Sequence, residues 1–102
     1  DECHAVDCPL WLAPEVIRTS VFSLKSDVFS YGMIIWELLT RKTPFPNEKS
    51  MAVIRTMVVN GTMPDIPQTI PSLATLVADC WKPVDERPSF FQILQFLENI
   101  TV

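Results

Sequence analysis

The chain has 102 residues, enough for one domain or part of one, and 48% of them are hydrophobic, which suffices for a globular core. Its formal net charge is −4 and its eight basic residues are scattered, which argues against nucleic-acid binding because the phosphate backbone requires clustered lysine and arginine. No apolar run approaches the ~20 residues of a membrane span, and no basic amphipathic stretch suggests contact with a membrane surface.

The N-terminal half predicts one short helix and one long apolar helix. Residues 1–12 form an irregular lead-in, and Pro14 suits the first turn of a helix over 14–17, since its missing N–H has no intrahelical partner there. Ser26 is a good N-cap for a helix over 27–40. That helix has almost no polar face, so other elements must surround it, and we expect it to be the axis of the core.

The next segment predicts a third helix followed by a proline-rich loop. Asn47 can cap a helix over about 48–59, whose apolar face carries Met51, Ile54 and Val58. Gly61 suits a left-handed exit from that helix. Residues 62–71 contain three prolines, and we expect them to be extended loop.

Two more helices complete the prediction. Ser72 caps a helix with apolar residues at i, i+3, i+4, i+7 and i+8, namely Leu73, Leu76, Val77, Cys80 and Trp81. Ser89 with Gln92 forms an S-x-x-Q capping box that opens a last helix. The apolar face of the last helix comprises Phe90, Ile93, Leu94 and Leu97. The sequence therefore predicts an all-α chain of about five helices, one of them short, around one buried apolar helix and without a sheet.

No residue of the sequence can be assigned to ATP chemistry. With only two glycines, Gly32 and Gly61, the chain has no Gly-rich loop that could cradle phosphates. It contains neither an H-R-D nor a D-F-G motif, so no catalytic aspartate and no Mg²⁺-binding side chain can be named. We expect this chain to have no catalytic, cofactor-binding or metal-binding residue of its own.

The cysteines suggest neither a metal site nor a disulfide framework. Cys3, His4 and Cys8 lie close in sequence, but structural zinc sites usually use two ligand pairs, and Cys80 is the only other cysteine. We therefore interpret these residues as incidental side chains of the terminus. Three cysteines form no paired set, which fits a reducing, cytoplasmic compartment.

Three charged residues have both a general and a specific interpretation. Glu15 and Arg87 each stand beside a proline at the edge of an apolar segment. Each could be an ordinary solvated charge, or the two could form a buried ion pair that ties the N-terminal segment to the last helix. Asp27 lies in the first turn of the apolar helix, where interaction with the helix dipole would explain it.

The order of several motifs resembles the distal half of the large lobe of a protein kinase domain, specifically of the tyrosine-kinase-like and tyrosine kinase branch. The resemblance covers about residues 8–100. The matching segments are Leu12-Ala13-Pro14-Glu15 for the A-P-E motif, Ser26-Asp27-Val28-Phe29-Ser30-Tyr31-Gly32 for S-D-V-[WY]-S-[FY]-G, Trp36-Glu37-Leu38-Leu39-Thr40 for its continuation, Thr43-Pro44-Phe45 for the connection that follows, and Cys80-Trp81 with Arg87-Pro88-Ser89-Phe90 for the last two helices.

The resemblance implies roles for individual residues. Glu15 is expected to pair with Arg87, and Asp27 to accept hydrogen bonds from the backbone of a catalytic loop that this chain does not contain. The expected substrate-facing loop comprises Cys8, Pro9, Leu10, Trp11 and Leu12. The region of residues 47–60 is expected to dock protein substrates or regulators. ATP and Mg²⁺ are implied for the parent kinase alone.

The sequence also departs from the family pattern in two places. Asp7-Cys8-Pro9 stands where many members have G-T-P, and the thiol of Cys8 is a weaker donor than a threonine hydroxyl. The segment from Cys80 to Arg87 is one residue shorter than the usual C-W-x-x-D-P-x-x-R-P.

Two hypotheses for the function follow from the sequence. The chain, which begins with Asp1 rather than methionine, is an excerpt of a kinase that phosphorylates protein hydroxyls, in the cytoplasm or inside a membrane receptor, or it is a non-catalytic protein-interaction module.

Overall fold

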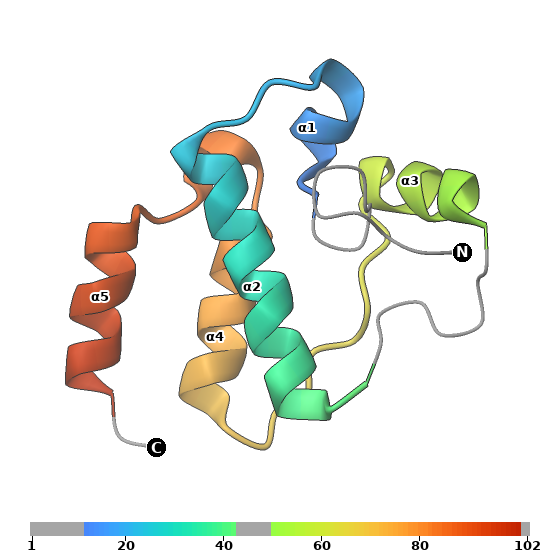
Figure 1. Cartoon of the computed structure of the whole chain (residues 1–102). Coiled ribbons are helices and arrows are strands. Elements are labelled where there is room, and N and C mark those ends of the chain that lie inside the picture. Colours follow the sequence, from blue (N-terminus) through green and yellow to red (C-terminus); the bar gives the residue numbers. More distant parts are fainter. Residues whose placement is uncertain (1–11, 43–49, 101–102) are drawn as a thin grey trace.

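The computed structural model describes residues 12–42 and 50–100, and within them every regular element is a helix (Figure 1). The described elements are α1 (Pro14–Thr19), α2 (Leu24–Thr40), α3 (Met51–Val59), α4 (Pro71–Cys80), the short 3₁₀ helix η1 (Val84–Glu86) and α5 (Phe90–Asn99). These segments contain no strand, so the predicted all-α fold with five α-helices is confirmed. None of the described helices is long and apolar enough to cross a bilayer.

Helix α2 supplies the axis of the core, as the sequence predicts. One cluster joins it to α4 and α5 through Val28, Ile35, Trp36, Leu76, Val77, Cys80 and Ile93. A second cluster joins it to α1 and α3 through Ala13, Val16, Phe29, Met33, Ile54 and Val58. Figure 1 shows α4 running beside α2, with α5 on one side and α1 and α3 on the other. The burial of Ile54 and Val58 confirms two of the three residues of the predicted apolar face of the third helix, and the side chain of Met51 lies outside the description.

The enclosure of α2 is incomplete in the part of the chain that the structure describes. Ile34 is 48% exposed and Leu38 is 66% exposed, and both project from one side of the helix. The two apolar clusters use other faces of α2. The sequence therefore predicted a more complete cover than these residues provide.

The predicted start of α2 was wrong by three residues. The helix begins at Leu24, and its N-cap is Ser23 rather than Ser26. The backbone N–H of Ser26 donates to the Ser23 hydroxyl at 3.1 Å, and the backbone N–H of Ser23 donates to the Ser26 hydroxyl at 2.8 Å. The two serines thus form a reciprocal capping box, which satisfies two N–H groups that a single cap would leave open.

The starts of α3 and α4 also differ from the prediction. Ser50 caps α3 by accepting from the backbone N–H of Val53, whereas Asn47 lies outside the described residues. Helix α4 begins at Pro71, so Ser72 is a residue of its first turn and not its cap. The Ser72 hydroxyl oxygen is buried without a hydrogen-bond partner among the described residues. Proline determines this start because its ring already holds the helical φ.

The remaining boundaries agree better with the sequence. Gly61 has a φ of 85°, which confirms the left-handed exit after α3. Ser89 and Gln92 form the predicted capping box of α5. Of the apolar face of α5, Ile93 is 3% exposed, whereas Phe90 and Leu94 are 40% and 54% exposed. The short helix α1 runs two residues beyond the predicted end at Ile17.

Helices α2 and α4 approach closely at Gly32. A Cβ atom at this position would lie 2.6 Å from the Cβ of Cys80 and 3.1 Å from the indole nitrogen of Trp81. The absence of a side chain therefore allows the contact between the two helices. The end of α4, and with it the segment that leads to Arg87, depends on this contact.

We predict that Gly32→Ala lowers the free energy of unfolding by about 1–3 kcal/mol because the added methyl group must displace α4. Helix propensity alone would favour alanine by about 1 kcal/mol, so a net loss isolates the steric effect. Urea unfolding followed by circular dichroism measures the change. Leu38→Ala, on an exposed face of the same helix, is the control. Equal or greater stability of Gly32→Ala would contradict the close approach.

Candidate functional site

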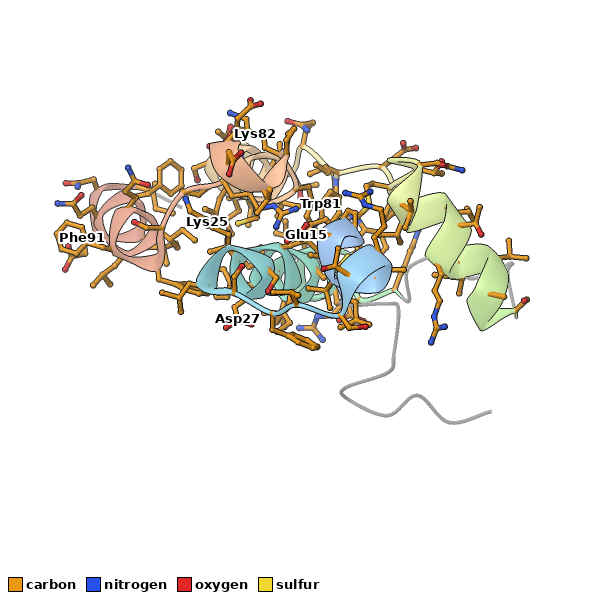
Figure 2. All side chains as sticks on the ribbon, turned by 90° about the horizontal axis from the view of Figure 1, so that it is seen from above. Glu15, Lys25, Asp27, Trp81, Lys82 and Phe91 are labelled. Atoms are coloured by element: carbon orange, nitrogen blue, oxygen red, sulfur yellow. The ribbon has the colours of Figure 1, made fainter. Side chains whose placement is uncertain are left out.

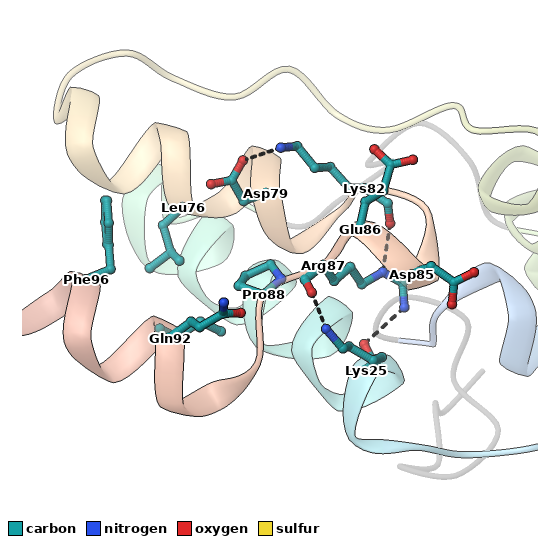
Figure 3. Close-up of a pocket in the computed structure, with 11 residues that line it drawn as sticks. Lys25, Leu76, Asp79, Lys82, Asp85, Glu86, Arg87, Pro88, Gln92 and Phe96 are labelled. Carbon is teal, nitrogen blue, oxygen red and sulfur yellow. Dashed lines mark hydrogen bonds and ion pairs between the residues drawn. The ribbon is translucent and has the colours of Figure 1, made fainter.

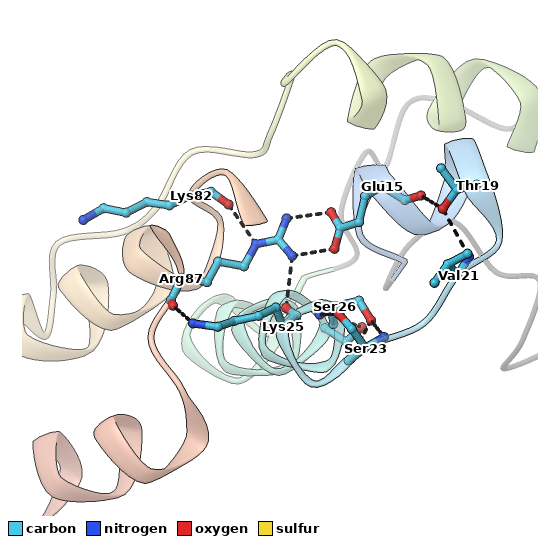
Figure 4. Close-up of polar contacts among 9 residues, drawn as sticks. Glu15, Thr19, Val21, Ser23, Lys25, Ser26, Lys82 and Arg87 are labelled. Carbon is cyan, nitrogen blue, oxygen red and sulfur yellow. Dashed lines mark hydrogen bonds and ion pairs between the residues drawn. The ribbon is translucent and has the colours of Figure 1, made fainter. Parts of the chain in front are cut away.

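Arg87 forms a buried ion pair with Glu15, 72 residues earlier in the chain (Figure 4). Arg87 Nη1 donates to Glu15 Oε2 at 2.7 Å, and Nη2 donates to Oε1 at 2.9 Å. The residue Arg87 is 3% exposed. The planar fork of a guanidinium matches the two oxygens of a carboxylate, so this bidentate geometry fixes direction as well as distance.

The other donors of Arg87 reach backbone carbonyls. Its Nη1 also donates to the carbonyl oxygen of Lys25 at 3.0 Å, and its Nε donates to the carbonyl oxygen of Lys82 at 2.8 Å. The guanidinium carbon lies 5.1 Å from the centre of the Phe29 ring. The two backbone carbonyls and the Phe29 ring help to offset the free-energy cost of removing the guanidinium charge from water. An ion pair alone often does not offset this cost.

We name this set of four residues, Glu15, Lys25, Lys82 and Arg87, the arginine clasp. It joins α1 through Glu15, the first turn of α2 through Lys25, and the end of α4 through Lys82. In Figure 4 these segments meet around the guanidinium from different directions. The clasp therefore fixes the position of α1 relative to the central helix.

The clasp also changes the ionisation of Glu15. Burial by itself would raise the pKa of Glu15, but the hydrogen bonds from Arg87 and from its own backbone N–H, with the charges of Arg87 and Arg18, outweigh it. The net result is a pKa below the ordinary value of 4.5. The carboxylate is therefore charged in the folded protein at neutral pH.

Asp27 lies on a different side of α2 from the clasp. Its side chain is exposed, and among the described residues its carboxylate has no hydrogen-bond partner. Figure 2 shows it on the side of α2 that faces away from Lys82. It borders a hollow of about 160 Å³ whose lining also includes Leu12, Ala13, Val16, Phe22, Ser26 and Ser30. The structure thus leaves this carboxylate open to a partner.

Of the predicted substrate-facing loop, the structure describes only the last residue, Leu12. Cys8, Pro9, Leu10 and Trp11 lie outside the described residues. Leu12 is half-buried against the cluster of α1, α2 and α3, and it borders the same hollow as Asp27. One member of the predicted loop and the predicted anchor are therefore neighbours at a single surface.

The other candidate groups offer no reactive chemistry in the described part of the chain. Burial, together with the charge of Asp79, raises the pKa of the Cys80 thiol to about 12, against a small opposing effect of Arg87. Such a thiol is not a nucleophile at neutral pH. Among residues 12–42 and 50–100, no group of three His, Cys, Asp or Glu side chains could hold a metal ion. Cys3, His4 and Cys8 lie outside those ranges.

Sequence reasoning missed Lys25 and Lys82 as members of the clasp. Both accept through backbone carbonyls, which every residue possesses, so the identity of the side chain carries no signal for them. Lys25 offered one usable sign. A cation in the first turn of a helix opposes the helix dipole, which indicates that some other interaction keeps it there.

A family model described as protein tyrosine and serine/threonine kinase matches residues 2–97. The chain belongs to the protein kinase domain family. Human mitogen-activated protein kinase kinase kinase 11 is 47% identical over 92 residues, which cover 88% of this chain and 11% of the relative. Dual specificity protein kinase shkC of Dictyostelium discoideum is 38% identical over 105 residues, which cover 100% of this chain and 21% of the relative.

A third relative shows how small a part of such proteins this chain represents. The probable serine/threonine-protein kinase pats1 of Dictyostelium discoideum is 41% identical over 93 residues, 88% of this chain but 3% of its own length. The chain thus spans about a fifth or less of these relatives. Family membership and the all-helical fold agree with a C-terminal helical segment of a kinase domain.

We predict that Arg87→Ala lowers the free energy of unfolding by about 3–5 kcal/mol, because it leaves the Glu15 carboxylate and two backbone carbonyls without their donor. Thermal unfolding followed by circular dichroism measures the loss. Arg41→Ala is the matched control, since Arg41 is exposed at the end of α2. Equal shifts in Tm for the two variants would show that the clasp contributes no more than a surface charge.

The lowered pKa of Glu15 gives a pH dependence with a defined sign. A carboxyl group with a folded pKa below its unfolded value stabilises the fold above the unfolded value, here 4.5, and this contribution is lost as the pH falls through the folded pKa. The difference in unfolding free energy between the wild type and Glu15→Gln should therefore be largest near pH 7 and shrink below pH 4.5. Glu98→Gln, at an exposed site in α5, is the control. A difference that is constant with pH would refute this assignment.

Proposed function

We propose that residues 1–102 are the C-terminal part of the large lobe of a protein kinase domain, without the small lobe and without the catalytic loop. The parent protein would transfer the γ-phosphoryl group of ATP to a protein hydroxyl. Family membership supports this proposal. The single structural observation that carries it is the arginine clasp, which holds α1 beside the exposed Asp27 carboxylate.

The role of this segment would be positioning. Enzymatic phosphoryl transfer depends largely on the alignment of the reactants and on electrostatic stabilisation of the transferred group. The clasp holds α1, and α1 continues directly from the loop that we expect to face the protein substrate, Cys8 to Leu12. The Asp27 carboxylate would accept backbone N–H groups of the parent's catalytic loop and so hold that loop against α2.

The parent would bind ATP and Mg²⁺ with residues outside the described part of this chain. Among the described residues no acidic cluster could hold a metal ion, and Asp27 is the one acidic side chain of the described residues that line its hollow. These residues do not fit the cofactors. Their contribution would be to the substrate and to the scaffold, and we assign them no step on the nucleotide.

The exposed apolar side of α2 supports the idea of a larger domain. Ile34 and Leu38 lie on the central helix and are largely open. Contiguous exposed apolar surface on a core helix usually marks a contact with another element. We propose that other parts of the kinase domain cover these two residues.

The finer assignments follow from the motifs and from the relatives' names. The relatives are named as a mitogen-activated protein kinase kinase kinase, a dual specificity protein kinase and a probable serine/threonine-protein kinase. The family description covers both tyrosine and serine/threonine kinases. We propose a member of the tyrosine-kinase-like or tyrosine kinase branch, located in the cytoplasm or inside a receptor. Protein substrates or regulators would dock near residues 47–60, of which α3 and its flanks are described.

We predict that Asp27→Asn in the intact parent kinase lowers kcat about ten- to a hundredfold, since hydrogen bonds to a charged group contribute about 1.5–3 kcal/mol. The Tm of residues 1–102 alone should change little, because the Asp27 side chain is exposed and accepts no hydrogen bond from the described residues. Asp85→Asn, at an exposed aspartate in η1, is the control. Phosphate transfer to a peptide mixture, followed by phosphoamino-acid analysis, measures the rate and identifies the hydroxyl.

The coding sequence upstream of Asp1 gives an independent test. It should encode an H-R-D motif and a D-F-G motif at the distances usual for a kinase domain. A start codon close to Asp1, or a parent that binds partners but transfers no phosphate, would replace this proposal with the non-catalytic interaction module.

A further inference from the structure

Lys25 occupies a position that its side chain should disfavour. It is the second residue of α2, at the positive end of the helix dipole, and it is half-buried. Repulsion between a cation and this end of a helix typically costs about 0.3–1 kcal/mol. Its neighbour Leu24 is 76% exposed, so Lys25 is not held at this position by burial of the whole first turn. The placement of Lys25 therefore calls for a specific partner.

That partner is the backbone of Arg87. Lys25 Nζ donates a hydrogen bond to the Arg87 carbonyl oxygen, and Arg87 Nη1 donates in return to the Lys25 carbonyl oxygen at 3.0 Å. Both bonds are drawn in Figures 3 and 4. Two residues 62 positions apart are thus joined in a closed ring, side chain to backbone in each direction.

The surroundings of Arg87 explain why its backbone needs this bond. A hollow of about 570 Å³ lies among α4, η1 and α5, and Arg87, Pro88 and Lys25 all border it (Figure 3). Open space therefore lies on this side of the segment that carries Arg87. The ammonium group of Lys25, at the edge of the same hollow, is the described side-chain donor to the Arg87 carbonyl.

We propose that Lys25 is a positioning residue that fixes the backbone of Arg87 and so aims its guanidinium fork at Glu15. The bidentate geometry tolerates little displacement, because two parallel hydrogen bonds must form together. Through Glu15, Lys25 then fixes α1 and the loop that precedes it. The structural part of this proposal is independent of the activity, and its consequence for a protein substrate rests on the proposed function.

A double-mutant cycle on stability tests the structural part. The variants are Lys25→Met, Glu15→Gln and their combination in the full chain, followed by urea unfolding at pH 7. Lys25→Met should destabilise the fold, and Glu15→Gln should cost less in its presence than in the wild type. Lys25→Arg, which retains a charged donor of similar length, should restore most of the stability. Additive effects, or no rescue by Lys25→Arg, would overturn the proposal.

Lys82→Met is the matched control for the loss of a positive charge. The Lys82 ammonium pairs with Asp79, whereas its contact with the clasp is made by its backbone carbonyl, which the substitution keeps. Its effect should therefore be independent of Glu15→Gln. Coupling of Lys82→Met as strong as that of Lys25→Met would show that charge alone acts, and would reject the positioning role. Should Lys25→Met not fold, the milder Lys25→Gln takes its place in the cycle.

Kinetics of the intact parent kinase test the consequence for the substrate. Lys25→Met should raise KM for a peptide substrate about tenfold, the effect of losing roughly one hydrogen bond, with KM for ATP unchanged and with recovery in Lys25→Arg. An unchanged peptide KM, or a parallel rise in both constants, would refute this consequence. If the wild-type parent transfers no phosphate, the proposed function fails, while the stability cycle still decides the role of Lys25.

Discussion

The burial of one guanidinium constrains the whole described structure. A charge that is 3% exposed must find partners for its donors inside the protein. Arg87 finds them in Lys82, five residues away, and in Lys25 and Glu15, which are 62 and 72 residues away in sequence. Each partner has a direction, so the constraint acts on orientation as well as distance. Helix α1 has six residues and could not hold its own conformation in water. Its place beside α2 follows from this charge and from the apolar contacts of Val16.

The apolar core and the clasp depend on each other. Phe29 belongs to the cluster that joins α1, α2 and α3, and its ring also lies under the Arg87 guanidinium. Gly32 lets α4 approach α2, and the segment after α4 then brings the Lys82 carbonyl to Arg87. A displacement of α4 would therefore move a partner of the buried charge. Packing and electrostatics therefore constrain the same residues here.

The sequence predicted the number and order of the helices because each has an apolar face of the right period or a clear capping box. It failed where several residues could serve the same purpose. Ser23 and Ser26 are three positions apart and both can cap, and only the reciprocal pair shows which one begins the helix. At α4 the helical φ of Pro71 outweighs the cap that Ser72 suggested. The apolar face of α5 could not show how much of it is covered, because the described residues bury Ile93 and leave Phe90 and Leu94 largely exposed.

At the site, what could be predicted depends on whether side chains or backbone atoms make the contact. Glu15 and Arg87 could be named in advance because each lies in a motif that resembles the kinase family, and their charges alone left a solvated surface position equally open, whereas the carbonyls of Lys25 and Lys82 carry no such sign. The two acidic residues of the site differ in whether their carboxylates already have a partner. The Glu15 carboxylate is committed inside the clasp, with its pKa lowered by Arg87 against burial. The Asp27 carboxylate is exposed and has no partner in the described residues, so of the two it alone can engage a further segment.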